Sequence, residues 1–404
     1  MFKFKRDAIL FLTGVFLLGF GLSGFRLLFN LYLKEIGFGE GKIGLLLALM
    51  TYATMIMIFP AAFITKKLKI KPIFIVSILL STIGSFIAII TCRYFQIALG
   101  MVIIGLSSSF FSVISGPFMM QVSTSLERAH LFSLNFAISL ASGILGNILA
   151  GNLPVIFLKN NIPLISGFRF AIIIHILISL LSLLPFLLIK EERIVNEENL
   201  KIFDIKTSKT LILILSIPHI LVGFGAGLTV PFLNLYFRDR FSLDSAKIGY
   251  LFSISQFMMI IGTLSAPFFS NIFGKIKTVI ISQILSVPFL FILSITYNLP
   301  LAAISFLLRA TLMNMAQPLV INFSLEIVEE TDRPLVSGIL NVAWLSAWGI
   351  SANLGGRIIE REGYFLPFNL TLVFYVISSF LYYFFILPIE KDKKVFFKIL
   401  KLKK

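Results

Sequence analysis

The sequence predicts an all-α polytopic membrane protein with twelve transmembrane helices. Of its 404 residues, 58% are hydrophobic and only 13% are charged, whereas soluble domains average roughly 45–50% apolar and about 25% charged residues. The apolar residues form runs of about 20 or more, which is the length that crosses a bilayer core as a helix. Strands of a membrane barrel would be about 10 residues long with alternating polarity. Composition and run length therefore favour helices over a barrel.

Twelve apolar runs give the predicted spans in chain order. They cover residues 8–33, 43–65, 73–92, 96–122, 131–157, 169–189, 209–237, 248–272, 278–297, 300–325, 335–357 and 368–388. The first run follows the basic start MFKFKRDAIL, as a signal-peptide core would. It is too long for such a core, however, and no small-residue cleavage pattern follows it. We therefore expect an uncleaved first helix.

The formal net charge of +16 follows the loops. With the N-terminus inside, Lys and Arg are roughly twice as frequent at the inner ends of the spans as at the outer ends, which is typical of cytoplasmic loops. Topology therefore explains the basic composition, and no nucleic-acid partner is expected. Both termini are predicted to be cytoplasmic, in an integral protein of the cell (plasma) membrane.

The basic C-terminal sequence KDKKVFFKILKLKK alternates lysines with large apolar side chains. This pattern suits a short helix lying on anionic lipid, and a disordered basic tail is an equally good interpretation. Cys92 is the only cysteine of the chain, which excludes an intramolecular disulfide and a cysteine metal cluster. No metal ion or cofactor is expected.

The chain repeats itself on the two sides of its longest polar stretch, KEERIVNEENLKIFDIKTSK. The segment GFGLSGFRLLFNLY at 19–32 returns as GFGAGLTVPFLNLY at 223–236, with two glycines and the Asn-Leu-Tyr triplet matched. We therefore predict a six-helix bundle over residues 1–189, a cytoplasmic linker over 190–208, and a second six-helix bundle with the basic tail over 209–404.

A second match lies at the inner ends of the fourth and tenth runs. Glu127 and Arg128 there correspond to Asp332 and Arg333 at nearly the same offset. Parallel repeats of six spans imply two halves related by an axis along the membrane normal. The two acid–arginine pairs are predicted to brace the cytoplasmic gate between such halves.

These residues resemble the major facilitator superfamily over essentially the whole chain. The resemblance rests on the six-plus-six spans, on the turns GFGEGKIG and FSLDSAKIG that follow the repeated helix, and on a basic turn after the second span of each half. For that basic turn the family has Gly-x-x-x-Asp-Arg-x-Gly-Arg-Arg. The second copy keeps Gly274, Lys275 and Lys277, whereas the first copy keeps only lysines. The resemblance implies a secondary transporter whose first, fourth, seventh and tenth spans line a central cleft.

Polar residues on those spans are the predicted substrate contacts. They are Arg26, Asn30, Ser109, Ser112, Asn234, Arg309 and Gln317. A charge inside the membrane is a functional hypothesis by default, and two arginines at a similar depth would attract an anion. The alternatives are snorkelling of an arginine towards the headgroups, a structural role for it, and, for glycine and serine stripes, close helix packing.

Two further groups are candidates. Asn341, Trp344 and Trp348 share one face of the eleventh span, where the tryptophans either stack on an apolar part of the substrate or fill the bundle. His175 and His219 are the only groups inside the spans that titrate near neutral pH, since no Asp or Glu lies well inside a span. The histidines are therefore possible proton carriers, with simple packing as the alternative.

The sequence thus predicts a transporter and not an enzyme. It has no phosphate-binding P-loop and no paired carboxylates or nucleophile with a base inside the spans. The expected function is movement of a small solute by alternating access, with an organic anion as the substrate. An exporter of amphipathic or cationic compounds is the alternative within transport, and a transport-inactive membrane sensor or scaffold is the alternative from another class. We expect a monomer.

Overall fold

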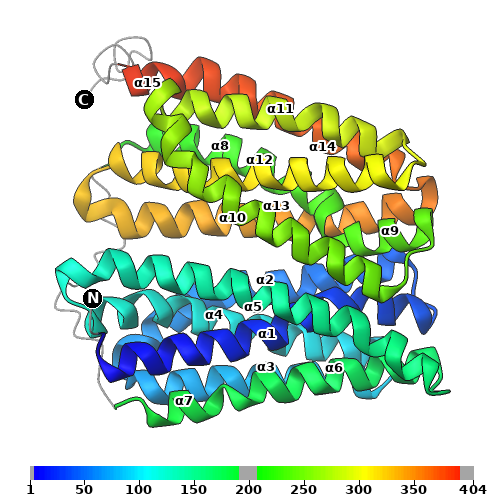
Figure 1. Cartoon of the computed structure of the whole chain (residues 1–404). Coiled ribbons are helices and arrows are strands. Elements are labelled where there is room, and N and C mark those ends of the chain that lie inside the picture. Colours follow the sequence, from blue (N-terminus) through cyan, green and yellow to red (C-terminus); the bar gives the residue numbers. More distant parts are fainter. Residues whose placement is uncertain (1–3, 191–206, 392–404) are drawn as a thin grey trace. The chain divides into compact units, whose positions relative to one another are not determined.

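The structure is a computed structural model, and it describes residues 4–190 and 207–391. Within these residues, twelve segments are helical, long and apolar enough to cross a membrane. Each lies on one of the predicted apolar runs, so all twelve predicted spans are confirmed (Figure 1). The basic tail, and the predicted linker apart from its ends, lie outside the described residues.

Several spans are built from more than one helical piece. The elements are α1 (Arg6–Glu35), α2 (Glu40–Lys67), α3 (Ile70–Ile90), α4 (Tyr94–Val122), α5 (Ser125–Lys159), α6 (Leu164–Leu181), α7 (Leu183–Leu188), α8 (Lys209–Thr229), η1 (Val230–Phe232), α9 (Leu233–Phe241), α10 (Ser245–Phe273), α11 (Lys275–Ile295), α12 (Leu299–Glu326), η2 (Glu330–Asp332), α13 (Arg333–Glu362), α14 (Phe365–Leu381), η3 (Tyr382–Ile386) and α15 (Leu387–Lys391).

The seventh span shows why the two copies of the repeat differ. Its α-helix ends at Thr229, and one 3₁₀ turn intervenes before α9 begins. Pro231 lies in that turn and has no N–H for a helical hydrogen bond. The equivalent position in the first copy is Leu27, and α1 runs through it unbroken. A single proline therefore divides a span that its repeat keeps continuous.

The helices group into two compact units. The N-terminal unit comprises Met1–Asn199 and Phe232–Gln256, and the C-terminal unit comprises Leu200–Pro231 and Phe257–Lys404. In the first unit α1 packs against α5 and α6, and in the second α8 packs against α13 and α14. These are equivalent helices of the two repeats, so the internal similarity of the sequence extends to helix packing.

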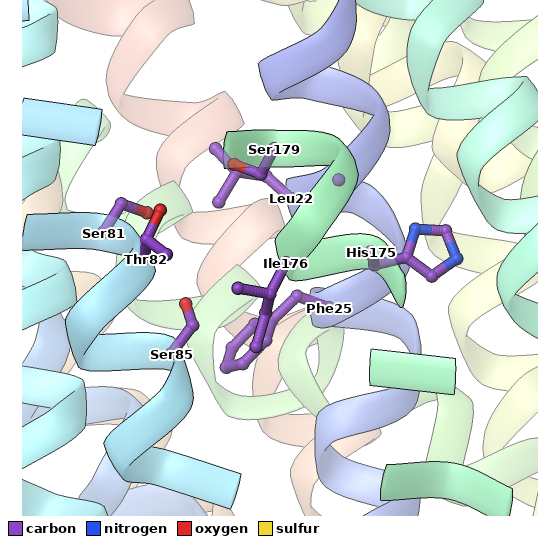
Figure 2. Close-up of a pocket in the computed structure, with 9 residues that line it drawn as sticks. Leu22, Phe25, Ser81, Thr82, Ser85, His175, Ile176 and Ser179 are labelled. Carbon is purple, nitrogen blue, oxygen red and sulfur yellow. The ribbon is translucent and has the colours of Figure 1, made fainter. Parts of the chain in front are cut away.

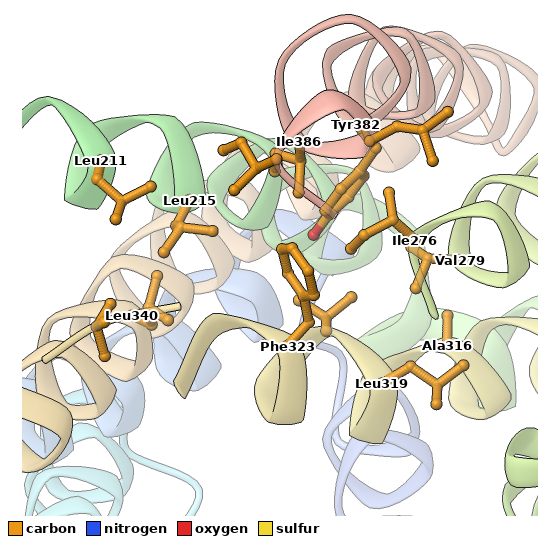
Figure 3. Packing of buried hydrophobic residues seen from close by; sticks show 14 of the residues in the cluster. Leu211, Leu215, Ile276, Val279, Ala316, Leu319, Phe323, Leu340, Tyr382 and Ile386 are labelled. Carbon is orange, nitrogen blue, oxygen red and sulfur yellow. The ribbon is translucent and has the colours of Figure 1, made fainter. Parts of the chain in front are cut away.

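Each unit has its own apolar core. In the N-terminal unit Phe11, Phe74, Phe118 and Phe186 pack ring against ring, with centroids 4.7–6.1 Å apart. In the C-terminal unit the core surrounds Tyr382 and joins α8, α11, α12 and the last span (Figure 3).

The outward faces of the helices are apolar as well. On α10 the exposed residues Ile254, Phe257, Ile261, Leu264 and Phe268 recur every three or four positions and form one stripe. Such a stripe would be unfavourable in water, and it is what a helix presents to lipid, where its backbone groups are bonded internally. The chain is therefore an integral membrane protein.

Candidate functional site

The predicted site residues differ widely in their exposure. Exposed are Arg26, Ser112, Gln317 and Asn341; partly exposed are His219, Trp344 and Trp348; buried are Asn30, Ser109, His175, Asn234 and Arg309. Because a transported solute must reach the side chains that bind it, the exposed and partly exposed residues are the geometrically available ones.

Arg26 is an exposed residue of α1. Its side chain is exposed, and none of the described residues hydrogen-bonds or ion-pairs with it. The guanidinium is therefore a cation within an apolar span that is available to a ligand.

Small residues of α1 serve helix packing. A Cβ added at Gly19 would collide with the Ser142 hydroxyl of α5, and one added at Gly146 would lie 2.5 Å from the Phe20 carbonyl oxygen and closer still to the Ser23 hydroxyl. These distances leave no room for a side chain. For glycine and serine residues in the spans, close helix packing is the predicted alternative to substrate contact, and at Gly19 and Ser23 the contacts support packing.

The second copy makes the same contact with the residue types exchanged. In the N-terminal unit Ser23 of α1 meets Gly146 of α5, and in the C-terminal unit Gly227 of α8 meets Ser351 of α13. The serine is on the first helix of the pair in the N-terminal unit and on the second helix in the C-terminal unit, with the glycine opposite it each time. Each pair therefore contains one serine side chain. The repeat therefore conserves the total volume at this crossing and not the residue at each position.

Asn30 and Asn234 are partners of each other. The Asn30 Nδ2 donates to the Asn234 Oδ1 at 3.4 Å, and the Asn234 Nδ2 donates to the Leu27 carbonyl oxygen at 2.9 Å. Both residues belong to the N-terminal unit, and both are at most 4% exposed. The matched amides of the two repeats are thus hydrogen-bonded to each other in a buried position.

Arg309 lies inside the C-terminal unit and is 6% exposed. Its Nη2 donates to the Tyr375 hydroxyl at 2.5 Å, and its guanidinium lies 5.7 Å from the centroid of the same ring. The Arg309 Nε and the Ser305 hydroxyl, one turn earlier, have no partner among the described residues. This arginine is therefore bound by α14, with one further donor left over.

The serines of α4 bond to their own helix. The buried Ser109 donates to the Leu106 carbonyl oxygen at 2.7 Å, and the exposed Ser112 donates to the Ser109 carbonyl oxygen at 3.0 Å. Such back-bonding satisfies a hydroxyl in an apolar span. Ser112 still has lone pairs on the free face, whereas Ser109 has no exposed surface.

The predicted residues of α13 lie together. The rings of Trp344 and Trp348 are 6.1 Å apart and inclined by 28°, and the His219 ring lies 5.2 Å from that of Trp344. Asn341, one turn earlier, is exposed. The structure thus brings four of the predicted residues to one place in the C-terminal unit.

His175 is enclosed in the N-terminal unit. It has no exposed surface, its ring stacks on Phe20 at 5.7 Å, and Gly24 makes room for it. Neither ring nitrogen has a hydrogen-bond partner among the described residues. A proton carrier needs a neighbour to exchange protons with, and the ring of His175 lies against Phe20 and Gly24.

A small polar cavity lies beside His175, between α1, α3 and α6 (Figure 2). Its volume is about 10 Å³, which is the space of a single water molecule. Ser81, Ser85 and Ser179 line it, and the His175 ring is turned away from it. It is far too small for a solute.

The two acid–arginine pairs at the inner helix ends make local contacts. Arg128 donates to the Met120 carbonyl oxygen at 3.4 Å, and Arg333 donates to the Leu325 carbonyl oxygen at 2.9 Å. Each arginine therefore reaches back eight residues to the end of the preceding helix, where carbonyl groups lack helical partners. The repeat conserves this contact.

The acids of the same pairs differ. Glu127 forms a capping box with Thr124 at the start of α5. Asp332 is 4% exposed and accepts a hydrogen bond from the Thr207 backbone N–H at 2.5 Å. In the second copy the acid therefore binds the backbone just before α8. The match between the two repeats does not predict this contact.

Acidification is expected to weaken the start of α5. The hydrogen bonds from Thr124 hold the pKa of Glu127 below its ordinary value, which is about 4.3 for glutamate. A lowered folded-state pKa stabilises the fold above that ordinary value, and the contribution disappears as the pH falls through the lowered pKa. Thermal unfolding between about pH 3 and pH 7 should show a smaller acid-induced loss for Glu127→Gln than for the natural chain. The exposed Glu362 provides the control Glu362→Gln, and equal pH profiles for both variants would contradict the assignment.

Two contacts escaped sequence reasoning. Arg169 donates to the Tyr32 hydroxyl at 3.0 Å, and Tyr32 in turn donates to the Ile89 carbonyl oxygen at 3.1 Å. The contact of Arg309 with Tyr375 is likewise not predicted by spacing along the chain. A buried tyrosine on an apolar span does signal a polar partner, but spacing along the chain does not say which one.

Metal binding finds no support in the described residues. No group of three or more His, Cys, Asp or Glu side chains within residues 4–190 and 207–391 could hold a metal ion. Among the predicted contacts, the exposed or partly exposed ones are neutral polar groups, aromatic rings and the guanidinium of Arg26.

The sequence model of the Major Facilitator Superfamily matches residues 11–221 and again residues 215–401. A search of curated protein sequences finds no significant match. Among solved structures, a bacterial homologue of the human lysosomal transporter Spinster, inward-facing and occupied, is similar with a TM-score of 0.77 and 13% identity over 93% of this chain and 95% of that one. At such identities the likeness concerns the fold.

Two further solved structures have the same fold. A bacterial homologue of the iron transporter ferroportin gives a TM-score of 0.75 at 16% identity, over 94% of this chain and 98% of that one. The nucleoside transporter NupG gives 0.74 at 15% identity, over 99% and 100% of the two chains. One is a homologue of an iron transporter and the other is a nucleoside transporter, so one architecture serves different cargoes and the fold leaves the substrate open.

Proposed function

The chain belongs to the major facilitator superfamily, and on this premise we propose that it carries a small organic anion across the plasma membrane by alternating access. Both termini would lie in the cytoplasm, as the distribution of lysines and arginines favours. The proposal concerns the substrate class, because the family has members for many kinds of cargo.

The exposed, unpaired guanidinium of Arg26 is the observation that carries the proposal. A permanent charge within an apolar span is costly unless a partner or water compensates it, and none of the described residues provides a carboxylate for it. Val230 stands at the equivalent position of the second repeat, so the arginine is not part of the repeated helix packing. An anionic group of the substrate would supply the missing partner.

Arg309 supports the same proposal less directly. It is buried and already hydrogen-bonded to Tyr375, so binding a substrate would require that contact to open. We therefore assign the substrate anion to Arg26 and a structural role to Arg309. Ser112, Gln317, Asn341, Trp344 and Trp348 remain proposed contacts because they are at least partly exposed.

Uptake into proteoliposomes tests the proposal. Purified full-length protein is reconstituted and offered radiolabelled lactate, succinate and benzoate, with glucose and choline as uncharged and cationic comparisons. Arg26→Gln should lower uptake of the anion by about ten- to a hundredfold, since a hydrogen bond to a charged group is worth about 1.5–3 kcal/mol. Arg26→Lys should lower it less.

Arg357→Gln is the matched control, because it also removes one exposed arginine from a span. Anion uptake by Arg26→Gln equal to that of this control would refute the role of Arg26. Preferential transport of choline would instead favour an exporter of cationic compounds.

A further inference from the structure

We infer that the cargo of this transporter carries a planar ring, and that Trp344, Trp348 and His219 form the surface on which the ring stacks. The inference rests on the proposed transport function and adds a chemical class to its substrate. All three residues belong to the C-terminal unit, so the site is defined within one compact body.

The Trp344 ring is held in place from behind. Trp344 lies against Gly223, where an added Cβ would come within 3.2 Å of the indole Cε3. The indoles of Trp344 and Trp348 are nearly parallel, inclined by 28°, and His219 adjoins the first of them at 5.2 Å. Glycine on α8 thus allows an indole to lie close to the helix, and the packing fixes its orientation.

The rings are not packed on every side. Both tryptophans and His219 keep part of their surface exposed, and neither indole N–H donates to any described residue. A residue that only fills a bundle is buried, and a buried indole N–H normally finds an acceptor. Open ring faces and open donors together indicate a surface that receives a partner.

Trp348 does not lie on the side of α13 that carries its exposed large apolar residues. Ile350 and Leu354 are the exposed large apolar residues of this helix. At about 100° per residue, Ile350 lies about 200° around the axis from Trp348, on the opposite side. The exposed Asn341, seven residues before Trp348, shares the tryptophan face instead. A polar amide and two indoles near mid-span are typical of a ligand-binding face, because tryptophan in contact with lipid prefers the membrane interface.

Stacking on this surface favours flat, polarisable groups. Offset and tilted aromatic pairs gain attraction beyond the burial of apolar area, by up to about tenfold in affinity. The His219 nitrogens, the indole N–H groups and the Asn341 amide could bind a polar atom on the ring or beside it. Since the proposed function makes the cargo an organic anion, a planar ring narrows the substrate class to aromatic carboxylates.

Tryptophan fluorescence gives a direct test, since the chain contains two tryptophans and both lie in this site. Para-nitrobenzoate, which quenches indole on contact, is titrated into the purified full-length protein, and benzoate or cyclohexanecarboxylate is then added as competitor. The two competitors share charge and carbon skeleton and differ in the flat ring. We expect saturable quenching that benzoate reverses at about fivefold lower concentration than cyclohexanecarboxylate.

Single-tryptophan variants locate the effect. Trp344→Leu and Trp348→Leu each leave one indole as reporter, and each should abolish the preference for benzoate over cyclohexanecarboxylate. Trp344→Phe and Trp348→Phe keep a flat ring and should retain it. If a leucine variant fails to fold, His219→Leu replaces it in the comparison, because loss of this ring should also reduce the preference for benzoate. The phenylalanine variants remain the controls that keep a flat ring.

The outcomes separate the two proposals. Quenching that rises without saturation, or equal competition by both carboxylates, overturns the ring site. Uptake of a non-aromatic anion that depends on Arg26, with no saturable quenching, leaves the transport proposal standing and removes this one. Saturable quenching with the expected preference, but without transport of any anion, keeps the ring site and removes the transport proposal.

Discussion

Replacement of Gly227 by alanine is expected to destabilise the protein by about 1–3 kcal/mol, as overpacking of a close helix crossing does. The new methyl group would lie 2.7 Å from the Trp348 carbonyl oxygen and 3.0 Å from its Cα, and closer still to the Ser351 hydroxyl. Since two of the three atoms are backbone, α8 and α13 would have to separate. Thermal unfolding of the purified protein in detergent measures the loss.

Gly338→Ala is the matched control on α13. Nothing lies within 4 Å of a Cβ at Gly338, so alanine there should be neutral or stabilising by about 0.5–1 kcal/mol through its better helix propensity. Equal losses for both variants would show that the crossing of α8 and α13 is not tightly packed.

In the N-terminal unit the same crossing has a serine on the first helix and a glycine on the second, which suggests a second substitution that would restore stability. Gly227→Ser puts a serine where α1 has Ser23, and Ser351→Gly restores the glycine that α5 has at Gly146. The double variant should therefore recover part of the stability that Gly227→Ser loses. Additive losses in the double-mutant cycle would contradict direct contact between these positions.

Loss of the Tyr375 hydroxyl is expected to be the second large effect. Tyr375→Phe leaves the buried guanidinium of Arg309 its aromatic neighbour but removes the oxygen that accepts from Nη2 at 2.5 Å. Hydrogen bonds to charged groups contribute about 1.5–3 kcal/mol, and removing one partner of a buried charge is costly. The variant should unfold at a lower temperature than the natural chain.

The combination of Arg309→Met with Tyr375→Phe separates structure from substrate binding. Replacing both polar partners by apolar groups of similar size can be neutral or stabilising, so the double variant should be more stable than Tyr375→Phe alone. If Arg309 has the structural role proposed here, anion uptake should survive in the double variant. Stable protein that no longer transports would instead identify Arg309 as a substrate contact.

Parts of the candidate site could be predicted from spacing and parts could not. Helical periodicity correctly groups Asn341, Trp344 and Trp348, because residues three, four and seven apart share a face whatever the neighbours are. It could not distinguish Arg26 from Arg309. Both are arginines at similar depth in apolar spans, and only packing shows that the first is exposed whereas the second is buried against Tyr375.

The opening segment of the repeat shows the same limit. Two matched asparagines suggested a cleft, and the structure pairs Asn30 with Asn234 inside the N-terminal unit. The glycine and serine stripe suggested either a cleft or close packing, and the Cβ positions at Gly19 and Gly146 support packing. A polar or small residue in a span indicates that its position serves either helix packing or ligand contact. Which of the two applies depends on the neighbouring helix.

The sequence by itself determined the twelve spans, the internal repeat and the family resemblance. A helix satisfies its backbone hydrogen bonds within one segment and needs about 20 apolar residues to cross the bilayer, so both requirements can be read along the chain. Only the tertiary structure decided which face of each helix is free. Lipid and protein interior are both apolar, so hydrophobicity does not distinguish the side of a span that meets lipid from the side that meets another helix.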